Sequence, residues 1–136
     1  MVYTAFGDGE AAMTIILERY PIPGRGRLEL SVKISAEIKI SAEDARRKVN
    51  GFLLNNLSYL TVAERQPELV IGEKVFWRIA VNHTLPGFGA IGKIGVIDVD
   101  VETGEIQPVA PEQLEEMKRR AKTLAASYPL DTSPAG

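Results

Sequence analysis

The side chains in this sequence that could do chemistry are few. The chain has no cysteine and one histidine, which excludes disulfides, thiolate metal sites, cysteine nucleophiles and any centre that needs several histidines. The unperturbed pKa of histidine would suit His83 to act as a general base, and Asp98 or Asp100 could approach it through strand pairing. No side chain near it in the sequence would orient it, so a surface histidine is the simpler interpretation. We expect no catalytic residue, no metal and no cofactor.

A glycine-rich stretch at residues 87–92, GFGAIG, matches the dinucleotide-binding fingerprint letter for letter. That motif requires a helix directly after the glycines, because the helix N-terminus holds the pyrophosphate. Here residues 93–99 have the alternation of a strand, and Pro86 precedes the motif. We interpret the stretch as a connecting loop in which Leu85, Phe88 and Ile91 form an apolar surface for a protein partner.

Four acidic residues, Asp98, Asp100, Glu102 and Glu105, resemble the start of a calcium-binding loop. The glycine comes one residue late, and Val109 stands where the last acidic ligand belongs. Strand alternation also accounts for Asp98 and Asp100, since the residues between them are apolar. A solvated strand face is therefore the preferred interpretation, and no metal site is predicted.

Basic residues do not gather in any part of the chain. Lysine and arginine number 16 against 18 aspartate and glutamate, which gives a net charge of −2. The two basic runs, at residues 46–48 and 118–120, lie on predicted amphipathic helices that also carry acidic residues. Nucleic-acid binding needs clustered cations that neutralise several phosphates, and the sequence disfavours it.

The periodicity predicts strands and two helices. The first helix begins at Ser41, followed by acidic residues, and the second begins at Pro111. Period-two alternation is clear at residues 27–35, where Leu28, Leu30, Val32 and Ile34 share one face, and this predicts a half-buried strand. Further strands are predicted at residues 14–20, 59–66, 69–71, 74–83 and 93–101, with a loop at 84–92.

These elements predict an α+β fold, a curved antiparallel sheet of four to five strands packed against two helices on one face. At 136 residues the chain has the size of one domain. We assign residues 13–128 to it, with a flexible N-terminal segment at 1–12 and a flexible tail at 129–136. No apolar run reaches the roughly 18 residues of a membrane span, and the start lacks signal-peptide features. A cytoplasmic location is expected.

Residues 41–106 resemble a PepSY-type domain. The resemblance rests on SAEDA at 41–45, which opens a helix, on the aromatic strand FWRIAV at 76–81, and on IDVDVETGEI at 97–106. It implies a module of a helix and an antiparallel sheet that binds or inhibits peptidases rather than catalysing a reaction. Cystatin-like folds and some small bacterial immunity proteins share this order of elements.

The first hypothesis for function is a non-enzymatic protein-interaction module. Without a catalytic constellation, the chain would act as an inhibitor, immunity or antitoxin-like partner. A homodimer is expected, because an open sheet edge tends to be covered or paired.

The alternative is a small-ligand-binding protein or minor enzyme. It would use a pocket on the concave sheet face near His83, lined also by Trp77, Asp98 and Asp100. A sizeable cavity beside His83 would favour it. Trp77 is otherwise a core residue.

Overall fold

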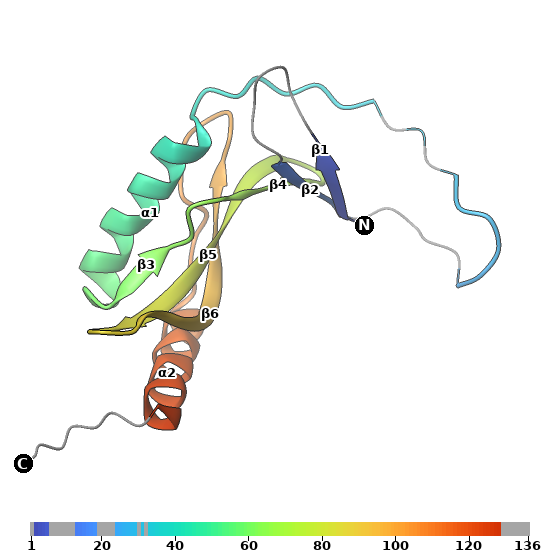
Figure 1. Cartoon of the computed structure of the whole chain (residues 1–136). Helices are drawn as coiled ribbons and strands as arrows, with labels where there is room; N and C mark the ends of the chain where they lie inside the picture. Colours follow the sequence, from blue (N-terminus) through green and yellow to red (C-terminus); the bar gives the residue numbers. More distant parts are fainter. Residues whose placement is uncertain (1, 6–12, 19–23, 30, 32, 129–136) are drawn as a thin grey trace, which may run out of the picture.

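The computed structural model describes residues 2–5, 13–18, 24–29, 31 and 33–128. Within them, six strands form one sheet, and two helices pack against it (Figure 1). This confirms the predicted α+β fold. No helix among these residues is long and apolar enough to cross a membrane. The elements are β1 (Val2–Ala5), β2 (Met13–Leu17), α1 (Ala42–Asn56), β3 (Thr61–Ala63), β4 (Glu68–Ile71), β5 (Val75–Leu85), β6 (Gly89–Asp100) and α2 (Pro111–Ser127).

The sheet is built around β5, which pairs along both of its edges. β6 pairs antiparallel with one edge, while β4 and β3 pair antiparallel with successive stretches of the other. The sheet is therefore five strands wide, within the predicted range. It continues from β4 to β2 and β1, and the β2–β4 pair is parallel. This one parallel pair departs from the antiparallel prediction.

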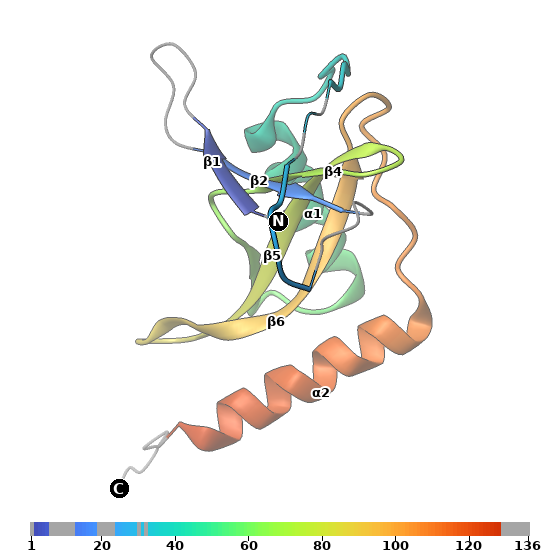
Figure 2. The same ribbon diagram turned by 90° about the vertical axis from the view of Figure 1, so that its right-hand side faces the viewer.

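Both helices lie on the same face of the sheet, as predicted. The buried core joins α1 (Val49, Leu53), β5 (Trp77, Ile79) and α2 (Met117). α2 packs against β6 on this side, and Figure 2 shows it below this strand. Close packing depends on glycines in β6, because a Cβ at Gly95 would lie 3.0 Å from Met117 Cγ. We call the sheet surface that α1 and α2 cover the helix face and the opposite surface the open face.

Local signals determine where both helices begin. The Ser41 hydroxyl accepts a hydrogen bond of 3.0 Å from the Asp44 amide, which satisfies one of the unpaired N–H groups in the first turn. Pro111 opens α2, and the Gln113 side-chain oxygen accepts a hydrogen bond of 2.9 Å from the Ala110 amide. These are the boundaries that capping rules predict.

Among residues 27–35, those that the structure describes do not form the predicted half-buried strand. The described residues between Gly24 and Ile40, which we call the arm, have no regular secondary structure and belong to no strand of the sheet. The arm runs away from the sheet and the helices (Figure 1, blue to cyan). The exposed fractions of Leu28 and Ile34 are 43% and 39%. The alternation is present in the sequence, but no strand in the described part of the chain pairs with these residues.

Two further predictions about local structure are wrong. Val2–Ala5, assigned to a flexible segment, forms β1 and pairs antiparallel with β2, since its residue types favour strands. Residues 84–92, predicted as a loop, form the tight end of the β5–β6 hairpin, where Leu85 pairs with Gly89. Gly87 and Gly89 adopt positive φ there, which glycine permits without steric cost. Residues 6–12 and 129–136 lie outside the described residues.

Candidate functional site

The candidate residues on β5 and β6 lie on two different faces of the sheet. Successive side chains of a strand point to opposite faces, and Trp77 and His83 lie on the helix face with Ile79 and Val81. Asp98 pairs with Arg78 across the strands, which places both on the open face. Asp100 is in register with Phe76, also on the open face. The ligand-binding hypothesis assumed that one pocket is lined by Trp77, His83, Asp98 and Asp100. This is wrong, because these residues lie on opposite faces of the sheet.

His83 is buried, with an exposed fraction of 7%. Its Nδ1 atom has no hydrogen-bond partner among the described residues. Burial lowers the pKa of the imidazole, because an apolar environment disfavours the charged form. The ring is therefore neutral near pH 7 and carries one acceptor and one donor nitrogen. The interpretation of His83 as a surface histidine is therefore wrong, because the side chain is buried between the sheet and the helices.

A cavity of about 250 Å³ lies beside His83. It is open to solvent and is bordered by the residues after α1, by β3, β5 and β6, and by α2. Its lining residues are Leu57, Ser58, Thr61, His83, Ile94, Met117, Lys118, Ala121, Lys122 and Ala125. A cavity next to His83 is the observation that favours ligand binding, and it lies on the helix face between the end of α1 and α2.

On the open face, Asp98 is bound to an arginine. Arg78 makes two hydrogen bonds to the Asp98 carboxylate, of 2.9 and 3.0 Å, and one of 3.1 Å to Glu18. The hydrogen bonds to Asp98 raise the pKa of Arg78 further above its ordinary value. Such a two-pronged pair fixes the geometry of both side chains, and it ties β2, β5 and β6 together. Asp98 thus has a structural role.

Asp100 is buried and stabilises a turn. Its Oδ1 atom accepts hydrogen bonds from the Glu102 and Thr103 amides, of 2.8 and 3.1 Å. Gly104, at positive φ, completes the turn. The acidic stretch that resembles a calcium loop is therefore a turn. The Asp100 carboxylate stabilises it by accepting hydrogen bonds from backbone amides.

The apolar residues predicted to form one contact loop are separated by the hairpin. Leu85 is buried at the end of β5, and Ile91 is half-buried in β6. Phe88 remains exposed by 54%, and its ring meets Tyr128 edge to face, with centroids 5.6 Å apart. Of this set, Phe88 alone presents a large exposed apolar surface.

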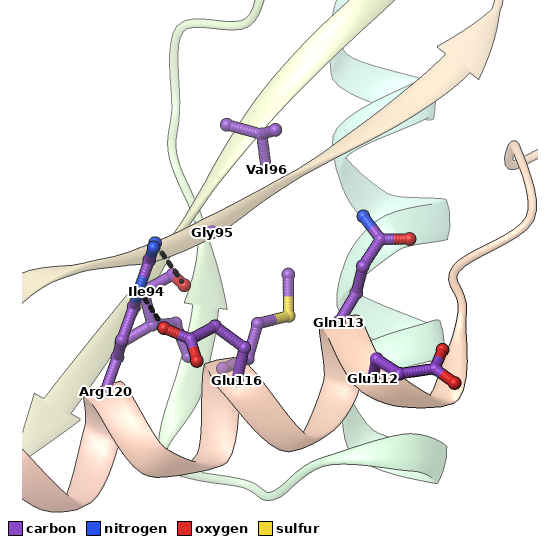
Figure 3. Close-up of a pocket in the computed structure, with 8 residues that line it drawn as sticks. Ile94, Gly95, Val96, Glu112, Gln113, Glu116 and Arg120 are labelled. Atoms are coloured by element: carbon purple, nitrogen blue, oxygen red, sulfur yellow. Dashed lines mark hydrogen bonds and ion pairs between the residues drawn. The ribbon is translucent and has the colours of Figure 1, made fainter.

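A groove runs between α2 and β6, outside the sheet. Ile94, Gly95 and Val96 of β6 form one wall, and Gln113 and Glu116 of α2 lie opposite (Figure 3). The groove has a volume of about 350 Å³. Arg120 crosses it with a hydrogen bond of 3.0 Å to Glu116 and one of 3.4 Å to the Ile94 carbonyl. We call this the β6–α2 groove; sequence periodicity could not place it, because its walls come from separate elements.

Trp77 anchors the root of the arm. Its indole N–H donates a hydrogen bond of 2.9 Å to the Ile40 carbonyl, and the Lys39 amide donates one of 2.8 Å to the Val101 carbonyl. Trp77 is thus a core residue, as the sequence suggested, and it fixes the place where the arm leaves the domain.

Comparisons with protein-family models, with curated proteins and with solved structures return no match.

Proposed function

We propose that the chain is a non-enzymatic protein-interaction module that works as a homodimer, in which the arm of each copy adds a strand beside β6 of the other. The observation that carries this proposal is the arm, a segment with the alternation of a half-buried strand that lies outside the sheet of its own chain. Addition of an extended segment to a sheet edge is a common mode of recognition.

The arm has the character of an interaction segment. Leu28 and Ile34, together with Ile38 at 51% exposure, place large apolar side chains in water, and such surface favours association. The connection between Leu17 and Ala42 is also long. Loops of more than about 15 residues without secondary structure are uncommon, and those that occur are usually functional or disordered. Lys39 and Ile40 hold its root against the domain.

The outer edge of β6 is a suitable receiver. The Asp100 amide and the Asp98 carbonyl point outward, where they bond Glu105 and Gln107. In an antiparallel strand alternate residues direct both backbone groups to the same side, so those of Val96 also point outward. Among the described residues, the outward N–H and C=O groups of Val96 take part in no backbone hydrogen bond outside the helices and the strand ladders.

The pattern of the arm fits this edge. A strand placed beside β6 would turn one face toward α2 across the β6–α2 groove and the other toward the open face. Leu28 and Ile34 would then cover the groove, and Ser31 and Lys33 would face solvent, which is the arrangement that sheets covered on one side require. Two exchanged arms give a closed, two-fold dimer.

The first test is oligomeric state. Light scattering coupled to size exclusion is expected to give a dimer for the natural chain and a monomer for Leu28→Asp/Ile34→Asp, which places charges on the apolar side of the arm. Ser31→Asp/Ser35→Asp adds the same charges to the polar side and is expected to stay dimeric. A natural chain that is monomeric at high concentration, or two variants with equal effects, would contradict the proposal.

Cross-linking then locates the arm. The chain has no cysteine, so Ser31→Cys and Lys93→Cys each introduce one defined thiol. A mixture of the two variants with a short bis-maleimide is expected to yield a cross-linked dimer that contains one copy of each. In a double variant, a bridge within one chain would show that the arm folds back on its own β6. Bridging to Thr4→Cys on β1 instead would show that the other sheet edge is the receiver.

A further inference from the structure

The cavity beside His83 contains an unsatisfied polar group. The imidazole is more than nine-tenths buried, and Nδ1 has no partner among the described residues. A buried polar atom without a hydrogen bond is costly and rare in native proteins. The neighbouring hydroxyls bond elsewhere, since Ser58 Oγ accepts from the Leu60 amide and Thr61 donates to the Ser58 carbonyl. His83 is part of the cavity wall, so a ligand bound there would lie against the ring that carries this unpaired nitrogen.

Two lysines of α2 border the same cavity. Lys118 and Lys122 are four residues apart and both belong to the lining. Like charges at this spacing repel each other on a helix. Lys118 contacts Glu115 at 3.4 Å, whereas Lys122 forms no ion pair with any residue in the described part of the chain. An anion between the two ammonium groups would relieve the repulsion.

The remaining lining is apolar. Leu57, Ile94, Met117 and two alanines of α2 provide most of the wall, and such a surface binds hydrocarbon in preference to water. The small side chains of Ala121 and Ala125 leave the space open. The cavity thus combines an apolar wall, a cationic border and one unsatisfied imidazole.

From this geometry we infer that the cavity is a binding site for a small organic carboxylate, with its carboxylate at Lys118 and Lys122, its apolar body against the wall, and a second polar group near His83. The site shares Ile94 and Met117 with the β6–α2 groove, but His83, Lys118, Lys122 and the two alanines do not line that groove. It therefore goes beyond the proposed dimer, and each proposal stands or fails separately.

The single histidine of the chain makes the test direct, because all imidazole resonances in the NMR spectrum come from His83. The probe is 4-hydroxybenzoate, which carries a carboxylate, an apolar ring and a distal hydroxyl. Addition at millimolar concentration is expected to shift the His83 resonances in a saturable way. The neutral 4-hydroxybenzamide is expected to bind roughly ten-fold more weakly, and benzoate, without the hydroxyl, several-fold more weakly.

Two variants assign the binding to this cavity. Lys122→Gln is expected to weaken 4-hydroxybenzoate binding about five-fold, whereas Lys74→Gln, at an exposed lysine of the β4–β5 turn, leaves it unchanged. Ala125→Leu, which fills the space from α2, is expected to abolish the shifts while the circular dichroism spectrum stays natural.

The inference is overturned if the His83 resonances do not move with 4-hydroxybenzoate, if the amide binds as tightly as the acid, or if Ala125→Leu binds normally. The arm variant Leu28→Asp/Ile34→Asp serves as a further control. It is expected to bind the probe with unchanged affinity, which separates a failure of this inference from a failure of the dimer.

Discussion

β5 and the arm have the same alternation of apolar and polar residues but opposite environments. In β5, Trp77, Ile79 and Val81 are buried on the helix face. In the arm, Leu28 and Ile34 stand in the same pattern and are exposed. β5 has strands on both edges and helices over one face, while the arm has neither.

The difference shows that alternation specifies an amphipathic strand but not its partner. A strand is stable once its backbone groups are paired and its apolar face is covered. β5 finds both within its own chain. In the proposed dimer, a second copy pairs the backbone of the arm and covers its apolar face. The requirement for paired backbone groups and a covered apolar face then holds for β5 and for the arm.

The largest difference between the two regions should appear in stability. Ile79→Ala removes a fully buried side chain and is expected to lower the free energy of unfolding by about 2–5 kcal/mol. Ile34→Ala, measured at a concentration low enough to keep the chain monomeric, should change it by less than about 0.5 kcal/mol. Urea denaturation followed by circular dichroism measures both, and equal losses would mean that the arm is packed in the monomer.

A smaller difference is expected for glycines. Gly95→Ala places a methyl group against Met117 of α2 and should cost about 1–3 kcal/mol through overpacking. Gly24→Ala at the start of the arm meets no atom within 4 Å and should be near neutral. Thermal unfolding of the two variants compares them, and a neutral Gly95→Ala would show that α2 is not seated closely on β6.

Proteolysis should distinguish the free arm from the docked one. Limited trypsin treatment of dilute protein is expected to cleave first after Arg27 and Lys33, which are exposed, and not after the ion-paired Arg78 of β5. At high concentration the proposed dimer pairs the arm backbone and should slow these cuts several-fold, in proportion to the dimer fraction. Mass spectrometry identifies the sites. Rates that do not depend on concentration would contradict arm docking.

The smallest effect concerns pH. Burial lowers the pKa of His83, so the unfolded chain takes up a proton more readily than the folded one. Stability should therefore fall as the pH decreases below about 6.5 and level off below the folded-state pKa. His83→Leu is expected to remove this slope, whereas the arm variant Leu28→Asp/Ile34→Asp retains it. Urea midpoints measured between about pH 7 and pH 5.5 provide the comparison, and an unchanged slope in His83→Leu would contradict this assignment.

Local patterns were sufficient for most of the fold. Ser41 and Pro111 mark helix starts by the way they satisfy or omit backbone N–H groups, and the alternation of β5 is uninterrupted. What local patterns could not specify is pairing between distant segments. The parallel contact of Ile15 with Leu69 leaves no sign in either strand. Residues 27–35 have a strand pattern in the sequence, but those of them that the structure describes belong to no strand.

The candidate site was only partly predictable, for the same reason. His83 was singled out because it is the one histidine, and a cavity does lie beside it. Its other components come from the end of α1 and from α2, which the fold alone brings together. Lys118 and Lys122 are four residues apart, and the sequence shows them as a like-charge pair on one side of a helix. This spacing was the sequence signal that could have indicated the cationic border of the cavity.

The parallel pair of β2 and β4 has a consequence for how the chain folds. The β5–β6 hairpin closes over a tight turn and can form early, whereas β2 can join β4 only after α1 and the arm have been looped out between them. The free-energy cost of closing such a loop grows only logarithmically with its length, by about 0.6 kcal/mol for each doubling. The stability of the domain therefore depends little on the length of the arm, so residues could be added to or removed from the arm at small cost to the domain that carries it.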